Sequence, residues 1–128
     1  VKSALEDAEL PFHLAYDKDG NFIGAAVETF TNKGFSGNIS LMVGILADGT
    51  VNNISVLQHA ETPGLGSKMS EPSFKDQFNN KHADSFNFNV KKDGGDIDAI
   101  TAATISSRAF CDAVNRAIST FENNKGGF

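Results

Sequence analysis

The sequence predicts an α+β fold in which a mostly antiparallel sheet packs against a C-terminal helix, with short additional helices. Strand patterns fill the first half of the chain, and a long helical pattern fills its end. The clearest strand pair is residues 38–46 and 51–58, which flank a hairpin turn of the Asp-Gly kind. The helix is indicated by apolar residues that recur at spacings of three and four: Phe110, Ala113, Val114, Ala117, Ile118 and Phe121.

Two further strands precede this pair. Residues 11–16 and 22–30 are predicted to form a hairpin around the turn Asp17–Asn21, because Asp, Gly and Asn tolerate the backbone angles of a tight turn. Residues 33–37 form a glycine-bearing loop that leads into the strong strand pair. The first half of the chain therefore predicts successive antiparallel strands.

The elements after residue 58 are shorter. Residues 72–78 are predicted to form a helix, with Ser70 as its N-cap and a proline at its first position. Residues 84–91 are predicted to form another strand, since apolar side chains alternate there: Phe86, Phe88 and Val90. The polar and glycine-rich residues 123–127 are predicted to end the final helix.

The composition fits one folded domain, residues 1–128. Apolar residues make up 40% of the chain and charged residues 21%, and 11 Phe with no Trp leave the bulky core positions mainly to Phe. The net charge of −5 argues against nucleic-acid binding, which needs clustered Lys and Arg. The single cysteine, Cys111, permits no internal disulfide, and no group of side chains has the spacing of a metal site.

The segment Asp98–Thr104 has the form Asp-x-x-[Ser/Thr]-x-Ala-Thr and directly precedes the final helix. A helix N-terminus exposes backbone N–H groups and a partial positive charge, so it suits a phosphate. Several hydroxyl residues cluster there: Thr101, Thr104, Ser106 and Ser107. Helix capping alone also accounts for hydroxyl residues at this place, so the local pattern leaves both interpretations open.

A second motif, Glu61–Gly66, reads Glu-Thr-Pro-Gly-Leu-Gly. Pro63 makes this loop rigid, and its two glycines leave the backbone sterically open. Such a loop allows close approach of the backbone to a flat ring. The alternative is a plain surface turn.

Together these motifs resemble the FMN-binding domain family, and within it the periplasmic G subunits of Rnf electron-transport complexes. The C subunits of sodium-pumping NADH:quinone reductases are the next most similar. The resemblance covers residues 20–121 and implies that Thr104 carries FMN through a phosphoester bond. It also implies that a flavin transferase recognises the motif formed by Asp98, Thr101, Ala103 and Thr104. The family usually has Gly where this chain has Ala102.

The resemblance further implies a set of cofactor contacts. Thr62, Gly64 and Leu65 would lie against the flavin, with a hydrogen bond from Thr62 and packing from Leu65. Phe35 and Ser36 match a second segment that borders the cofactor, although Phe35 also suits a core position. Lys91 would lie near the ribityl chain or the phosphate, and Thr101 near the attachment point; solvated surface lysines are the alternative for Lys91.

The implied function is electron transfer by an FMN-carrying domain, without independent turnover of a small substrate. The resemblance implies a membrane complex that couples ferredoxin and NAD oxidoreduction to ion movement. Its partners would be the other membrane subunits and the flavin transferase that matures it. We expect an extracytoplasmic, periplasmic domain of a single-span subunit whose N-terminal anchor is absent from this chain. Two alternatives stay open: an FMN-binding domain of another membrane reductase or regulator, and a flavin-free extracytoplasmic binding module.

Overall fold

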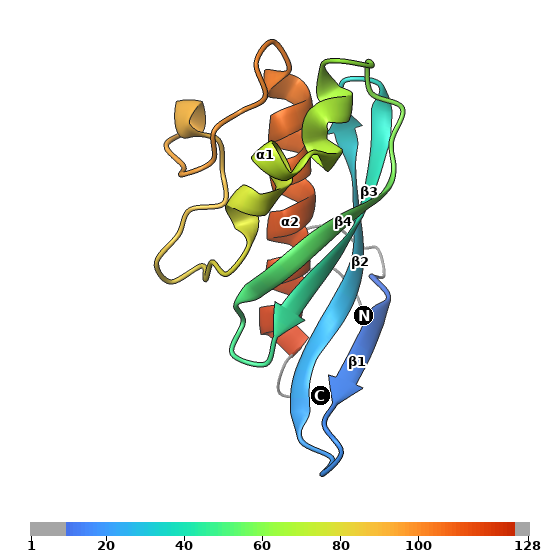
Figure 1. Ribbon diagram of the computed structural model, residues 1–128, viewed down its shortest axis with the longest axis vertical. Helices are drawn as coiled ribbons and strands as arrows, with labels where there is room; N and C mark the ends of the chain where they lie inside the picture. The colour runs from blue at the N-terminus through green and yellow to red at the C-terminus, as the bar shows by residue number, and fades with distance from the viewer. Residues whose placement is uncertain (1–9, 125–128) are drawn as a thin grey trace.

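The computed structural model describes residues 10–124. Within this range, an antiparallel sheet in the order β1-β2-β3-β4 is covered on one face by the long helix α2, as Figure 1 shows. The α+β fold class predicted from the sequence is therefore confirmed. The strands and the long helix have these bounds: β1 Phe12–Tyr16, β2 Phe22–Gly34, β3 Gly37–Leu46, β4 Val51–Gln58 and α2 Thr104–Asn124.

The core lies between the sheet and α2. Register places Val27 of β2 opposite Val43 of β3, and Val43 opposite Ile54 of β4. Because side chains alternate across a strand, this row points as one set toward the helix. These three side chains are buried, as are Phe110 and Phe121 of α2. The apolar stripe seen in the sequence is thus the face of α2 that packs on the sheet.

The strands largely follow the sequence pattern, and β4 has the predicted bounds. β2 continues to Gly34 and β3 begins at Gly37, so the predicted loop 33–37 is shorter than expected. Only the two-residue turn Phe35–Ser36 remains between the strands, with Gly34 paired to Gly37. The pairing between β2 and β3 extends into the predicted loop because glycine has no side chain to prevent the close approach of the two backbones.

The predicted strand 84–91 is wrong. This stretch has only a single bridge, between Val90 and Ile97, and otherwise runs as turns and irregular chain. The alternation of apolar residues instead reflects packing of Phe88 into a ring cluster, where it stacks on Phe78 at 6.1 Å between ring centroids. No neighbouring strand supplies backbone partners along the segment. Side-chain bonds such as Asn87 N–H to Asp96 Oδ2 (2.8 Å) hold the loop instead.

The predicted helix 72–78 is present as α1, Pro72–Lys75, followed by a 3₁₀ turn at Asp76–Phe78. The predicted N-cap at Ser70 is wrong. Glu71 is the N-cap residue, and its side chain makes no capping hydrogen bond. Ser70 instead ends the preceding 3₁₀ turn, Gly66–Ser70, and another such turn lies at Lys91–Asp93.

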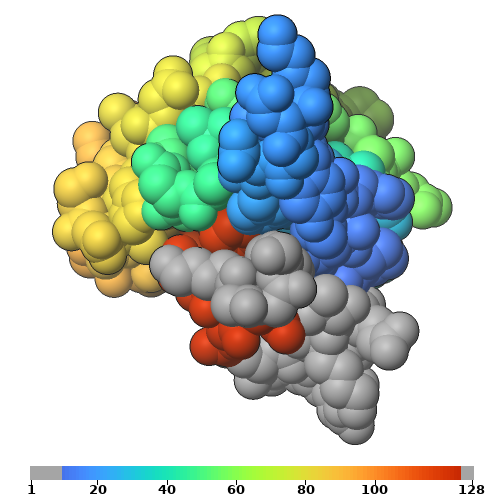
Figure 2. Space-filling view, turned by 90° about the horizontal axis from the view of Figure 1, so that it is seen from below, coloured from blue at the N-terminus to red at the C-terminus, as the bar shows by residue number. Residues whose placement is uncertain are grey.

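The predicted stop of the final helix falls partly on residues 125–127, which lie outside the described residues. Asn123 and Asn124 form the end of α2. At this end, Phe121 stacks on Phe22 at the start of β2, with 6.4 Å between ring centroids. Figure 2 views this end, where the β1–β2 hairpin in blue and the last turns of α2 in red lie.

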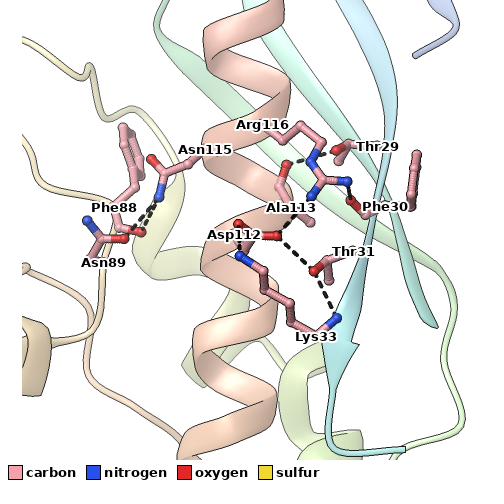
Figure 3. Close-up of polar contacts among 10 residues, drawn as sticks. All are labelled: Thr29, Phe30, Thr31, Lys33, Phe88, Asn89, Asp112, Ala113, Asn115 and Arg116. Carbon is pink, nitrogen blue, oxygen red and sulfur yellow. Dashed lines mark hydrogen bonds and ion pairs between the residues drawn. The ribbon is translucent and has the colours of Figure 1, made fainter. Parts of the chain in front are cut away.

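Polar side chains also join α2 to its neighbours, as Figure 3 shows. Arg116 is 2% exposed; it donates to the Phe30 carbonyl at 2.9 Å and pairs with Asp112 at 3.3 Å. On another side of α2, Asn115 donates to the Phe88 carbonyl at 3.2 Å. These bonds hold α2 in one position between β2 and the 84–97 loop.

Candidate functional site at the start of the long helix

Three segments that are far apart in the sequence meet at one end of the molecule. They are the β2–β3 turn Phe35–Ser36, the loop 61–66 and the first turn of α2, all at the top of Figure 1. The turn reaches this end because β2 and β3 are the longest strands. The fold therefore brings the two sequence motifs together.

A cavity of about 350 Å³ opens between these segments. Three large apolar side chains in its wall stay exposed: Phe35 at 68%, Ile105 at 50% and Leu65 at 39%. Exposed apolar side chains around a concave surface are typical of a ligand site. The cavity is lined by Phe35, Thr62, Leu65, Gly66, Ala102, Ala103, Thr104, Ile105 and Ser106.

Glu61 joins the three segments and is almost fully buried, at 4% exposure. Its two carboxylate oxygens accept hydrogen bonds from the backbone N–H groups of Phe35 and Ser36, each at 2.8 Å. Ser106 Oγ in the first turn of α2 donates to the same carboxylate at 2.7 Å. Burial by itself raises the pKa of Glu61, but these three hydrogen bonds outweigh it, so the pKa lies below its ordinary value.

Glu61 belongs to the second sequence motif, but the sequence indicates no role for its side chain. Its partners lie 25, 26 and 45 positions away in the chain, which no local pattern reveals. Ile105 was also missed. The signal for Ile105 is that this large apolar residue lies off the buried stripe of α2, so the core does not require it.

The glycines of the 61–66 loop have two different roles. Gly64 has a φ of +77°, a left-handed conformation that L side chains rarely adopt. Gly66 is buried, and a Cβ there would lie 2.4 Å from Ser106 Oγ and 2.7 Å from Glu61 Cβ. Gly66 thus permits the close contact between this loop and α2 on which the Glu61 bonds depend.

Thr104 is the first residue of α2 and lines the cavity. Its neighbours satisfy the backbone at this helix start. Ser107 N–H donates to the Ala103 carbonyl at 3.0 Å, and Ser107 Oγ accepts from the Ile100 N–H at 2.9 Å. The half-buried Thr104 hydroxyl makes no hydrogen bond to any residue in the range 10–124. Its oxygen is therefore available for chemistry at a helix N-terminus.

Ala102 has a φ of +61°, one of two non-glycine residues with positive φ among the described residues. It is the third residue of the turn Ile100–Ala103, which is closed by the Ala103 N–H to Ile100 carbonyl bond at 3.0 Å. A left-handed conformation suits glycine and strains alanine. The turn geometry thus gives a physical reason for glycine at this position of the motif.

Replacing Ala102 with Gly is expected to raise the free energy of unfolding by about 0.5–1 kcal/mol. Relief of the left-handed conformation gains about 1–2 kcal/mol, and the extra freedom of glycine in the unfolded chain removes about 0.4–1 kcal/mol of it. Urea unfolding of both proteins measures the difference. Ala99→Gly, at an exposed position without positive φ, is the control and should destabilise; a loss of stability in Ala102→Gly would contradict the strain assignment.

The structure divides the Asp98–Thr104 motif between two sides of the same turn. Ala102, Ala103 and Thr104 line the cavity, whereas Asp98 and Thr101 line a separate groove of about 260 Å³ beside α1. Thr104, which carries the candidate attachment oxygen, thus faces the cavity, and the polar residues Asp98 and Thr101 face the groove.

Lys91 lies outside the residues that line the cavity. Its Nζ pairs with Asp98 Oδ1 at 2.8 Å, and the hydrogen bond and charge of Asp98 raise the pKa of Lys91. Both side chains are well exposed. The structure therefore connects Lys91 to the polar part of the motif, and its predicted place near a ribityl chain or phosphate stays a prediction.

Other reactive groups lie apart from this site. Cys111 is buried in α2, and burial raises the pKa of its thiol to about 12, which makes it a poor nucleophile. Residues 10–124 hold no group of three or more His, Cys, Asp or Glu side chains arranged for a metal ion. In the same range, no helix has the length and apolar character needed to cross a membrane.

The fold and the cavity define an α+β cofactor-binding domain, with an apolar wall for a ring and a helix N-terminus for an anion. The family model of the FMN-binding domain matches residues 34–119, and the chain belongs to this family. FMN is the cofactor for which the family is named. The geometry suits that cofactor, because the exposed Phe35, Leu65 and Ile105 offer apolar contact beside the hydroxyl of Thr104.

Similar proteins include the G subunit of the ion-translocating oxidoreductase complex from Shewanella baltica, 40% identical over 124 residues. The protein of the same name from Aliivibrio fischeri is 42% identical over 114 residues. These matches cover 93% and 85% of this chain but only 58% and 54% of the relatives, so the chain spans little more than half of their length.

The C subunit of the Na⁺-translocating NADH-quinone reductase from Parabacteroides distasonis has a similar fold. Its TM-score is 0.71 at 22% identity, and the match covers 91% of this chain and 62% of that one. At this identity the likeness concerns the fold alone.

Proposed function

We propose that this chain is an electron-transfer domain that carries FMN covalently, through a phosphoester to Thr104. The observation that carries the proposal is the Thr104 hydroxyl, which starts α2, makes no hydrogen bond within residues 10–124 and opens on the apolar cavity. The family match supplies FMN as the cofactor. Bound FMN supplies reversible electron transfer, while the protein controls access and potential.

The residues around the cavity suit the parts of such a cofactor. A phosphate diester on Thr104 keeps one negative charge, which the N-terminus of α2 stabilises by about 0.3–1 kcal/mol. Phe35, Leu65 and Ile105 would pack on the ring, and the exposed Thr62 would donate a hydrogen bond to its polar edge. Gly64 and Ser36 do not line the cavity but lie next to residues that do, and their predicted contact with the flavin stays a prediction.

Attachment needs an activated donor, because a free phosphate monoester does not esterify an alcohol in water. We propose a flavin dinucleotide as the donor and a flavin transferase as the catalyst. The Thr104 Oγ1–P bond forms and the P–O bond of the donor's phosphoanhydride breaks. The hydroxyl proton is released and the nucleoside monophosphate leaves. Asp98, Thr101 and Ala103 would be the recognition residues.

The names of the relatives support a place in a larger assembly. Those proteins are subunits of an ion-translocating oxidoreductase complex. We infer that this domain passes electrons between other subunits of such a complex, of the ferredoxin:NAD oxidoreductase type. We also infer that it lies on the extracytoplasmic face of the bacterial inner membrane. The covalent bond suits that location, since a carrier there then needs no supply of free FMN.

The experiment that tests attachment is the intact mass of the protein, denatured after co-expression with a flavin transferase. We expect an increase equal to FMN minus one water, located on the peptide that contains Thr104. The Ala102→Gly variant, made in parallel, tests whether the methyl group hinders the transferase. An unshifted mass in both proteins would overturn the proposal.

Leu65→Ala is expected to leave the covalent bond intact but to raise the reduction potential of the attached flavin. Loss of this apolar wall admits water to the ring, which stabilises the more negative reduced form. Spectroelectrochemistry measures the potential. Leu57→Ala on β4 is the matched control, because Leu57 is also exposed (50%) but lies outside the cavity. Equal potentials in all three proteins would contradict contact between Leu65 and the ring.

A further inference from the structure

The segment Asp98–Ala103 has no helix or strand of its own, yet it carries most of the attachment motif. Its C-terminal half is ordered locally, by the Ala103 N–H to Ile100 carbonyl bond and by Ser107 Oγ, which accepts from the Ile100 N–H. Its N-terminal half, Asp98–Ala99, is exposed and has no such local closure. The hydrogen bonds that order this half come from another element.

That element is the 3₁₀ turn after α1, through Gln77. Gln77 Oε1 accepts from the Asp98 N–H at 2.7 Å, and Gln77 Nε2 donates to the Asp98 carbonyl at 3.0 Å. One side-chain amide thus satisfies both backbone groups of Asp98, as a neighbouring strand would do in a sheet. A third bond, from Gln77 Nε2 to the Phe74 carbonyl at 3.1 Å, fixes the amide itself.

Two buried aromatic side chains fix the position of the chain segment that carries Gln77. Phe74 and Phe78 flank it in the chain, and both are buried in the core. Each ring centroid lies 5.0 Å from that of Phe110 of α2. The amide that holds Asp98 is therefore attached, through two aromatic anchors, to the same helix that begins with Thr104.

The other contact to Asp98 is weaker. The Lys91–Asp98 ion pair joins side chains that are 63% and 72% exposed, and exposed pairs of this kind contribute little to order because water and salt screen them. It also holds the side chain of Asp98, whereas Gln77 holds the backbone.

We propose that Gln77 is a positioning residue for attachment of the cofactor, an inference that rests on the proposed function of Thr104. Its amide holds the backbone of Asp98 at the groove beside α1, where the local turn already orders Ile100–Ala103. The polar residues of the motif are thereby presented on one side of the turn while Thr104 faces the cavity on the other. The transferase then meets an ordered segment and does not have to order it on binding.

The test is the rate of attachment in vitro, with the purified full chain, flavin transferase and a flavin dinucleotide, followed by intact mass. Gln77→Ala is expected to lower kcat/KM for the chain as substrate by about tenfold, because the free energy needed to order one residue's backbone corresponds to roughly that factor. Gln77→Glu, which keeps the side-chain size, should also be slow. A carboxylate cannot donate to the Asp98 carbonyl, and it adds negative charge beside Asp98.

Asn115→Ala is the matched control. Asn115 is also a half-buried amide that ties an irregular segment to the core, through the Phe88 carbonyl and Asn89 Oδ1 (Figure 3). It should lose stability to a similar degree but be modified at the wild-type rate. Because Gln77 does not line the cavity, Gln77→Ala chains that have become modified should show the wild-type flavin spectrum and potential.

The outcomes separate the two proposals. If the wild-type chain is modified and Gln77→Ala is modified equally fast, the positioning role is overturned. It is overturned as well if Asn115→Ala is slowed as much as Gln77→Ala, since a general loss of stability would then be the cause. If neither the wild-type chain nor Ala102→Gly is modified, the covalent attachment itself fails, and the positioning role fails with it.

Discussion

Thr104→Ala is expected to abolish covalent FMN completely while the protein stays folded. The substitution removes the oxygen that forms the phosphoester, and Thr101, another hydroxyl of the motif, lines the groove and not the cavity. The Thr104 side chain makes no hydrogen bond within residues 10–124 and does not cap α2. The free energy of unfolding should therefore change by less than about 1 kcal/mol. Intact mass and urea unfolding measure the two effects.

Ser119→Ala provides the control for Thr104→Ala. Ser119 is a half-buried hydroxyl residue on the same helix, remote from the cavity, and its loss should leave the full mass increase. FMN that survives denaturation in Thr104→Ala would remove Thr104 from the proposed function. Loss of folding in that variant would instead contradict the geometry described for the start of α2.

Glu61→Gln is expected to destabilise the protein by about 2 kcal/mol and to loosen the cavity. The carboxylate accepts from two backbone N–H groups and one hydroxyl, and the amide NH₂ of glutamine would face one of these donors. A buried donor left without an acceptor costs about 1–3 kcal/mol. Urea unfolding measures the loss. Glu71→Gln removes the same charge at an exposed position and should change stability little, so an equal loss there would contradict a specific role for Glu61.

Glu61 also sets a pH dependence. Its pKa in the folded protein lies below the ordinary value of 4.5, so the ionised carboxylate stabilises the fold. This contribution is fully present above pH 4.5 and is lost as the pH falls through the lower folded-state pKa. Unfolding measured from neutral pH downward should show a smaller acid-induced loss in Glu61→Gln than in the wild type. Parallel curves would contradict the assignment.

Several elements could be predicted because local residues determine them. The β3–β4 hairpin follows from alternation on both sides of Asp48-Gly49, and α2 follows from an apolar stripe with a period near 3.6. By contrast, alternation alone does not make a strand. Phe86, Phe88 and Val90 alternate because the core takes up their side chains, while the tertiary structure offers their backbone no partner strand.

The candidate site also has some features that local sequence patterns predict and others that they do not. Local residues are enough to identify the two motifs and to place Thr104 at the start of a helix, since helix starts and glycine loops have local signatures. The bonds from Glu61 to the Phe35–Ser36 turn and from Gln77 to Asp98 exist because the folded chain places these residues next to each other. The fold also places one part of the Asp98–Thr104 motif at the cavity and the other part at the groove beside α1. These contacts join residues that chain folding brings together from distant positions, and no local pattern of residues encodes them.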